Sequence, residues 1–178
     1  MGLALDSQDM WDVTAGLPEQ VADAAANCHI ENPDALPPHD EIENVVILGM
    51  GGSGIAGDIL LASAAPFMAV PAVVVKSYTL PAFVTENSVV IAVSYSGDTE
   101  ETIEAASEAQ VAGAHLCVVS GPGQLRSLAQ EWGSAYIPVL ECSPQPRGAI
   151  GAISIPPLLA LESVGLFPGA RGWIEAAV

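Results

Sequence analysis

The sequence predicts an α/β protein in which a parallel, doubly wound sheet of about five strands forms the middle of three layers, preceded by an N-terminal helical extension. Short runs of apolar, β-branched residues alternate along the chain with longer segments of helical spacing. The runs are apolar throughout, as expected for parallel strands buried on both faces. Gly, Ser and Pro residues separate the segments, and this alternation favours right-handed crossovers between parallel strands.

The composition predicts one packed core. Of 178 residues, 51% are hydrophobic and 14% are charged, which excludes a disordered chain. Four basic against 21 acidic residues give a net charge of −17, so we expect no nucleic-acid partner and no anionic membrane surface as a partner. In physiological salt this field fades over ~8 Å, so an anion site must depend on local donors.

The cysteines and the apolar stretches indicate the cellular compartment in which the protein is expected. Three widely spaced cysteines without a CxxC pair predict neither a disulfide framework nor a metal site. Residues 1–12 lack the basic-then-apolar order of a signal peptide, and prolines interrupt the apolar stretches 59–75 and 149–161. We therefore expect a cytoplasmic protein without a membrane span.

The elements follow in a regular order. Residues 6–28 have helical spacing and predict a helix or helix pair, and a Pro-rich segment at 32–38 follows. We therefore assign 1–42 to a helical segment with a Pro-rich linker and 43–178 to a single domain. Strands are expected at 44–49, 72–76, 88–94, 116–120 and 135–139, and helices at 53–64, 98–112, 125–131 and between 148 and 165, the last starting or bending at Pro156 and Pro157. Ligands of such sheets bind at the carboxyl ends of the strands.

The first motif, Gly49-Met50-Gly51-Gly52-Ser53-Gly54, lies between the first strand and a helix. It satisfies the GxGxxG pattern of dinucleotide-binding sites. An NAD site would also need an acidic residue after the second strand, where this sequence has Lys76. Lys76 would suit the extra phosphate of NADP, so an NAD(P) site is one interpretation. A tight turn whose glycines permit close packing is another.

The second motif, Ser94-Tyr95-Ser96-Gly97-Asp98-Thr99, lies between the third strand and the next helix. Its three hydroxyls converge on a helix N-terminus, where free N–H groups and the helix dipole favour an anion. Neutral donors can thus hold a phosphate in an acidic protein. The alternative is a helix cap, in which Asp98 or Ser96 is the N-cap and Glu101 completes a capping box with Asp98.

These motifs resemble a known family. The runs ILGMGGSGIAGD (47–58), VSYSGDTEET (93–102) and PRGAIG (146–151), with the helix at 10–20, are similar to the first SIS (sugar isomerase) domain of bifunctional phosphoglucose/phosphomannose isomerases. The resemblance implies an SIS fold of flavodoxin-like strand order and a hexose 6-phosphate ligand without a further cofactor. It also implies roles for particular residues: Ser94, Ser96 and Thr99 hold the phosphate, Gly51, Gly52 and Ser53 line the sugar, and Arg147 faces the reacting end.

Arg147 is one of two arginines in residues 91–150. A guanidinium at this position would stabilise the enediolate that forms when a proton moves between C1 and C2 of an opened sugar. Its other interpretation is a salt bridge to one of the many carboxylates.

The general base is not identified. Members of the family are about twice as long, and their catalytic Glu, His and Lys come from a second SIS domain that this sequence does not contain. His29, His39 and His115 lie in no motif, and Glu141 after the last strand is only a geometric candidate. We therefore expect an isomerase or its substrate-binding half, with a non-catalytic sugar-phosphate sensor as the alternative and an NAD(P)-binding domain as a third. The apolar segment 150–167 further predicts a homodimer or a partner SIS domain.

Overall fold

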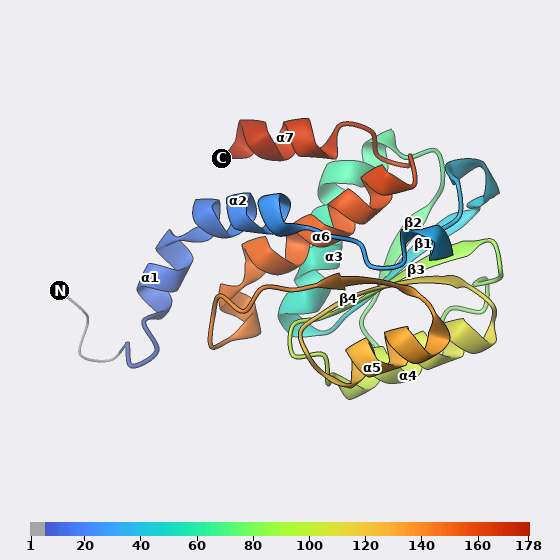
Figure 1. Cartoon of the computed structure of the whole chain (residues 1–178), viewed down its shortest axis with the longest axis horizontal. Coiled ribbons are helices and arrows are strands. Elements are labelled where there is room, and N and C mark those ends of the chain that lie inside the picture. The colour runs from blue at the N-terminus through green and yellow to red at the C-terminus, as the bar shows by residue number, and fades with distance from the viewer. Residues whose placement is uncertain (1–5) are drawn as a thin grey trace.

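The computed structural model describes residues 6–178. The chain begins with two helices, α1 (Met10–Ala15) and α2 (Leu17–Asn27). Two short 3₁₀ turns, η1 (Pro33–Ala35) and η2 (His39–Glu41), follow in the Pro-rich segment. The expected helix pair is therefore present (Figure 1).

A five-stranded parallel sheet forms the centre of the molecule, in the order β2-β1-β3-β4-β5. Its strands are β1 (Asn44–Leu48), β2 (Ala72–Val75), β3 (Ser88–Ser94), β4 (His115–Ser120) and β5 (Ala135–Pro138). The central strand β3 is buried along its whole length, whereas the edge strand β2 is only half-buried. All five predicted strands are present, and the flavodoxin-like order is confirmed.

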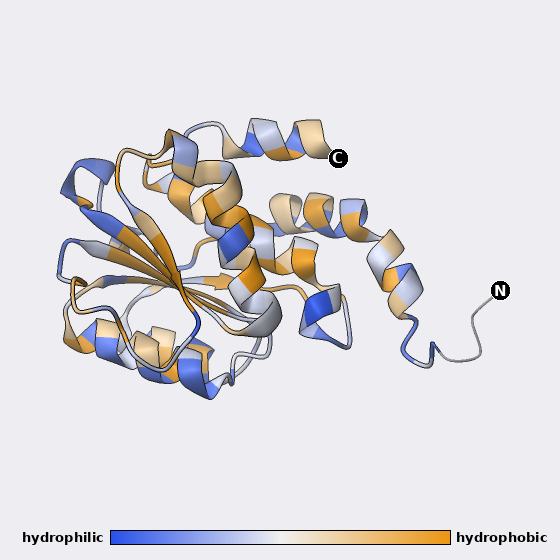
Figure 2. Ribbon diagram, turned by 180° about the vertical axis from the view of Figure 1, so that it is seen from behind, coloured by the Kyte–Doolittle hydropathy of each residue, from blue (hydrophilic) through white to orange (hydrophobic). Residues whose placement is uncertain are grey.

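Helices cover both faces of the sheet. Alternate strand residues serve different cores, with Val45 and Ile47 on one face and Val46 and Leu48 on the other. The first core includes α3 (Gly51–Ala64) and α6 (Ile150–Ser163), and the second includes α4 (Glu100–Val111) and α5 (Gln124–Trp132). The apolar strands are orange at the centre of Figure 2, with helices on both sides of them. The predicted three-layer architecture is confirmed.

The apolar segment that suggested self-association is buried within the chain. Residues 151–161 of α6 are all buried. Helix α2 and the C-terminal helix α7 (Ala170–Ala177) pack against α6 on the side away from the sheet (Figure 1). The segment therefore needs no second protein to cover it, and self-association remains a prediction without this support.

Two differences from the prediction concern the C-terminal helices. The final core helix α6 begins six residues before Pro156 and includes both prolines, so it does not start there. Helix α7, which follows Gly169 in a left-handed conformation (φ 89°), was not predicted. Within residues 6–178, no helix has both the length and the apolarity that a bilayer crossing requires.

Candidate functional site

The two sequence motifs meet at the topological switch point of the sheet, where the strand order reverses. From β1 the chain crosses to β2 on one side, and the later strands β3, β4 and β5 lie on the other side of β1. Helices α3 and α4 leave the carboxyl ends of the neighbouring strands β1 and β3 for opposite faces of the sheet. Such a switch point opens a crevice in which open α/β sheets bind ligands.

The loop 94–99, called the phosphate loop below, has an internal hydrogen-bond network. The hydroxyl of the fully buried Ser94 lies 2.8 Å from that of Thr99 and accepts the Gly97 N–H at 3.1 Å. If Ser94 donates to Thr99, the Thr99 hydroxyl is left to donate outward. Ser96 is exposed and accepts the Asp98 N–H at 3.2 Å. Ser96 is thus exposed and Thr99 half-buried, whereas Ser94 is buried within the loop.

The capping alternative is wrong for this loop. Helix α4 begins at Glu100 with Thr99 as N-cap, and no side chain caps it. The Asp98 carboxylate instead accepts the backbone N–H of Gln124 at 2.8 Å, which connects the loop to the start of α5. The N–H groups of the first turn of α4 have no acceptor within the helix, so they can serve an anion.

A glycine turn after β4 supports the phosphate loop from behind and was missed by sequence reasoning. Gly97 has a φ of +78°, and a Cβ on it would lie 2.6 Å from the backbone nitrogen of Gly123. Gly121 and Gly123 approach the backbones of Tyr95 and Gly97 as closely in return. The Gly-Pro-Gly signal at 121–123 was visible in the sequence, but its neighbour across the sheet was not.

The first motif contacts the phosphate loop directly. Gly51, the first residue of α3, has a φ of +51°, and the next two residues turn toward the loops of the other strands. The buried Ser53 accepts the Tyr95 N–H at 3.2 Å. Gly52 lies against the turn that carries Arg147, because a Cβ on it would be 3.1 Å from the Pro146 carbonyl oxygen.

Arg147 lies in the 3₁₀ turn η4 (Pro146–Gly148) at the same edge. A Cβ on Gly52 would be 3.3 Å from the Arg147 nitrogen, so the turn directly adjoins the first motif. Among residues 6–178, Arg147 is exposed and forms no ion pair, in contrast to the salt-bridge interpretation. Its guanidinium is therefore available to a ligand.

Tyr95 is a second feature that sequence reasoning missed. Its hydroxyl accepts the N–H groups of Cys142 at 3.1 Å and Ser143 at 3.0 Å, and donates to the Ser143 carbonyl at 2.8 Å. Burial raises the pKa of the phenol, so Tyr95 is neutral at physiological pH. The partners lie 47 and 48 residues away in sequence, and no local pattern signals such a contact.

Lys76, on which the NADP interpretation depended, is occupied by a neighbour. Its Nζ lies 2.5 Å from the Asp58 carboxylate, and its stem packs over Gly54, where a Cβ would be 2.9 Å from Cε. Both side chains are about half exposed, which makes this a weak surface pair. The Lys76 ammonium is nevertheless paired within its own domain. An NAD site would need an acidic residue at this position to bind the ribose.

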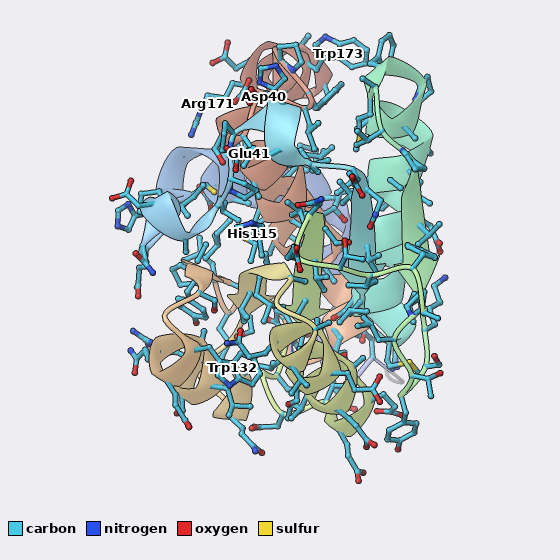
Figure 3. The ribbon with its side chains drawn as sticks, turned by 90° about the vertical axis from the view of Figure 1, so that its right-hand side faces the viewer. Asp40, Glu41, His115, Trp132, Arg171 and Trp173 are labelled. Atoms are coloured by element: carbon cyan, nitrogen blue, oxygen red, sulfur yellow. The ribbon has the colours of Figure 1, made fainter. Side chains whose placement is uncertain are left out.

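The candidate acid-base groups lie in three different parts of the structure. Glu141 lines a cavity of ≈ 320 Å³ together with Glu19 and Asp23 of α2. His115 begins β4, at the edge of the sheet opposite the strand ends, and its Nδ1 lies 3.2 Å from the Ala35 carbonyl oxygen (Figure 3). His39 lies beside Gly165 after α6. His115 and His39 thus lie away from the carboxyl ends of the strands, whereas Glu141 adjoins Cys142, whose backbone N–H donates to the Tyr95 hydroxyl.

Comparison with known proteins agrees with this geometry. The SIS domain family matches residues 41–130, and the chain belongs to this family of phosphosugar-binding domains. More particularly, it is related to bifunctional phosphoglucose/phosphomannose isomerases. It is 34% identical to that of Caldicellulosiruptor bescii over 169 residues, which are 95% of this chain and 49% of the relative.

A second relative and a solved structure extend the comparison. The bifunctional phosphoglucose/phosphomannose isomerase of Thermoplasma acidophilum is 42% identical over 113 residues, 64% of this chain and 34% of the relative. Tagatose-6-phosphate ketose/aldose isomerase from Escherichia coli superposes with a TM-score of 0.70 at 14% identity, over 99% of this chain and 52% of that one. The latter shows the fold alone. The chain thus spans about half or less of the length of these relatives.

Proposed function

We propose that this chain binds hexose 6-phosphates at the switch point and corresponds to the first SIS domain of a phosphoglucose/phosphomannose-type isomerase. The observation that carries the proposal is the convergence of three segments that are distant in sequence. The phosphate loop contacts the first motif through Tyr95 and Ser53, and the first motif contacts the Arg147 turn through Gly52. The relationship to bifunctional isomerases supports the choice of ligand.

In this proposal neutral donors hold the phosphate. The hydroxyls of Ser96 and Thr99 and the N–H groups at the start of α4 bind the anion, while Ser94 and Gly97 keep the loop in shape. Gly51, Gly52 and Ser53 line the sugar, which can approach the backbone because two of these residues lack side chains. Local donors are needed since the net charge of −17 does not attract an anion.

Arg147 would act at the other end of the sugar. Aldose–ketose isomerisation moves a proton between C1 and C2 of the open chain and passes through an enediolate, whose negative oxygen a guanidinium stabilises. The proton itself needs a base within hydrogen-bond reach. Glu141, the geometric candidate, is exposed and lines a cavity with Glu19 and Asp23. We therefore propose that this chain alone binds hexose 6-phosphates but isomerises them poorly or not at all.

The position of His115 at the amino end of β4, away from the two loops, also favours a second candidate, a sugar-phosphate sensor without turnover. The NAD(P) interpretation is less favoured because Lys76 is paired with Asp58 and the chain belongs to the SIS family. A thermal-shift comparison of fructose, glucose and mannose 6-phosphates with NADP distinguishes the two kinds of site. Stabilisation by NADP alone would overturn the proposal.

A coupled isomerase assay separates the isomerase from the sensor. The chain should be tested at several concentrations, alone and with a second SIS domain from a bifunctional relative. Turnover that appears only with the second domain supports an isomerase half. Binding of hexose 6-phosphates without turnover in either mixture would favour the sensor.

The proposed partner is a second copy of the chain or another SIS domain. The chain spans 49% of the relative from Caldicellulosiruptor bescii, so a complete site of that kind would need further residues. An exposed aromatic pair, Phe67 and Trp173, with ring centroids 4.9 Å apart, adds apolar surface beside α7. A cytoplasmic location, where the three free thiols would stay reduced, remains a prediction.

A further inference from the structure

The turn that carries Arg147 is held by polar side chains from two other parts of the chain. Tyr95 reaches it from the phosphate loop, and Gln20 reaches it from α2. Neither residue has a role in the binding scheme above. Tyr95 forms hydrogen bonds to the backbone before Arg147, at residues 142–143, and Gln20 forms one to the backbone after it, at residue 148.

Tyr95 connects three segments of the site. Its backbone N–H donates to Ser53 of the first motif at 3.2 Å, and its own backbone belongs to the phosphate loop. Its hydroxyl makes all three hydrogen bonds to Cys142 and Ser143. The Ser143 hydroxyl then continues the chain of contacts by donating to the Gln145 carbonyl at 2.9 Å and accepting the Gln145 N–H at 3.2 Å. The path from the phosphate loop to the residue before Pro146 is thus continuous.

Gln20 fixes the other end of the same turn. Its side chain is buried, and its Nε2 donates to the Gly148 carbonyl at 2.8 Å and to the Val13 carbonyl at 3.0 Å. The backbone is closely packed here, because a Cβ on Gly148 would overlap Ser143 Oγ and one on Gly151 would lie 2.7 Å from the Cβ of Gln20. The N-terminal helices therefore pack against the Arg147 turn itself.

We propose that Tyr95 and Gln20 are positioning residues that hold Arg147 at a fixed place relative to the phosphate loop. The inference rests on the proposed function, which assigns Arg147 to the reacting end of the sugar. A ligand that bridges both ends gains the Arg147 contact only if their separation is preset, since an ordering cost would otherwise offset it. Inorganic phosphate, which reaches only the phosphate loop, needs no such positioning.

The test compares fructose 6-phosphate with inorganic phosphate by titration calorimetry. Tyr95→Phe keeps the ring and removes the hydroxyl. We expect it to raise the Kd of fructose 6-phosphate roughly tenfold, because the hydrogen bond between the charged Arg147 and the sugar is weakened when the turn is released. The Kd of phosphate should change less than about twofold, because phosphate does not contact Arg147. Gln20→Leu should act in the same direction. The control is Gln130→Leu, at an exposed position of α5 outside the site.

The decisive comparison is a double-mutant cycle with Arg147→Ala. If Tyr95 acts through Arg147, Tyr95→Phe has no further effect on fructose 6-phosphate in the Arg147→Ala background. An undiminished effect there, or equal losses for fructose 6-phosphate and inorganic phosphate, would show a purely structural role and overturn the inference. If Tyr95→Phe does not fold, Gln20→Leu undergoes the same cycle.

A readout without ligand separates this inference from the proposed function. Hydrogen exchange should rise in residues 141–149 of both variants and stay unchanged in the phosphate loop, because only the Arg147 turn is released. Unchanged exchange in 141–149 would overturn the inference even if wild type binds hexose phosphates. A wild type without affinity for fructose 6-phosphate would instead refute the proposed function, and the exchange data alone would then decide whether the turn is positioned.

Discussion

Thr99→Val removes one hydroxyl from the phosphate loop while keeping the shape of the side chain. Thr99 is the N-cap residue of α4 but its side chain caps no backbone group, so valine loses no cap. Its one side-chain hydrogen bond joins it to Ser94, which also accepts the Gly97 N–H. The expected stability cost is therefore only about 0.5 to 1.5 kcal/mol.

The expected effect on ligand binding is larger. A neutral hydroxyl that donates to a phosphate contributes about 1.5 to 3 kcal/mol, so Thr99→Val should raise the Kd of fructose 6-phosphate roughly tenfold to a hundredfold. Ser96→Ala, at an exposed position of the same loop, should lose a similar amount. Titration calorimetry measures both changes, and inorganic phosphate should lose affinity in parallel because it uses the same donors.

Thr102→Val is the matched control, one turn further along the same helix. Thr102 is 1% exposed, and within the described residues its hydroxyl has no hydrogen-bond partner. Removing a buried, unpaired hydroxyl should leave affinity unchanged and stabilise the fold by up to about 1 to 3 kcal/mol, or roughly 2 to 4 °C in Tm for each kcal/mol. Equal affinities of the wild type and Thr99→Val would refute the assignment of this loop to the phosphate.

Three further predictions concern the fold and its surfaces. Gly97→Ala should lower the free energy of unfolding in urea by more than Gly133→Ala. Both glycines have positive φ (+78° and +65°), but only at Gly97 would a Cβ lie within 3 Å of backbone atoms. Equal decreases in the free energy of unfolding would contradict this packing argument. Burial raises the pKa of Cys117 to about 12 from an ordinary 9.0, so the unfolded chain loses this proton at a lower pH than the folded chain. Stability should therefore fall as the pH rises above 9.0, and it should fall less in Cys117→Ala. Identical pH profiles of the two proteins would show that Cys117 does not cause the loss. Light scattering at tens of micromolar should show a dimer, and a monomer would count against self-association.

The strands could be predicted from the sequence because their signal is local. Runs such as Val45–Leu48 are apolar at successive positions and rich in β-branched residues, which is typical of a parallel strand buried on both faces. The start of α4 was placed two residues early, since Asp98 has the chemistry of a cap but is bound to Gln124 of another helix. Local chemistry thus identified the loop and tertiary contacts set its boundary.

The candidate site could be predicted only in part. The two glycine- and serine-rich loops were recognisable because each follows a strand, and the strand order then brings them together. The roles of Tyr95 and Gln20 were not, because Gln20 and Gly148 are 128 residues apart and neither sequence position has an unusual pattern. The segment 150–167 suggested a partner because its apolarity was visible, whereas the helices that cover it were not.

The central claim is that one site formed by three loops binds the whole hexose 6-phosphate. At 18.2 kDa the chain is suited to amide NMR, and a titration with fructose 6-phosphate tests the claim residue by residue. The account predicts that the amide signals of residues 49–54, 94–102, 147 and 148 shift together with a single Kd, and that inorganic phosphate shifts chiefly 94–102. Shifts confined to the cavity between α2 and α7, lined by Ala22, Arg171 and Ile174, or no shifts at all, would contradict it.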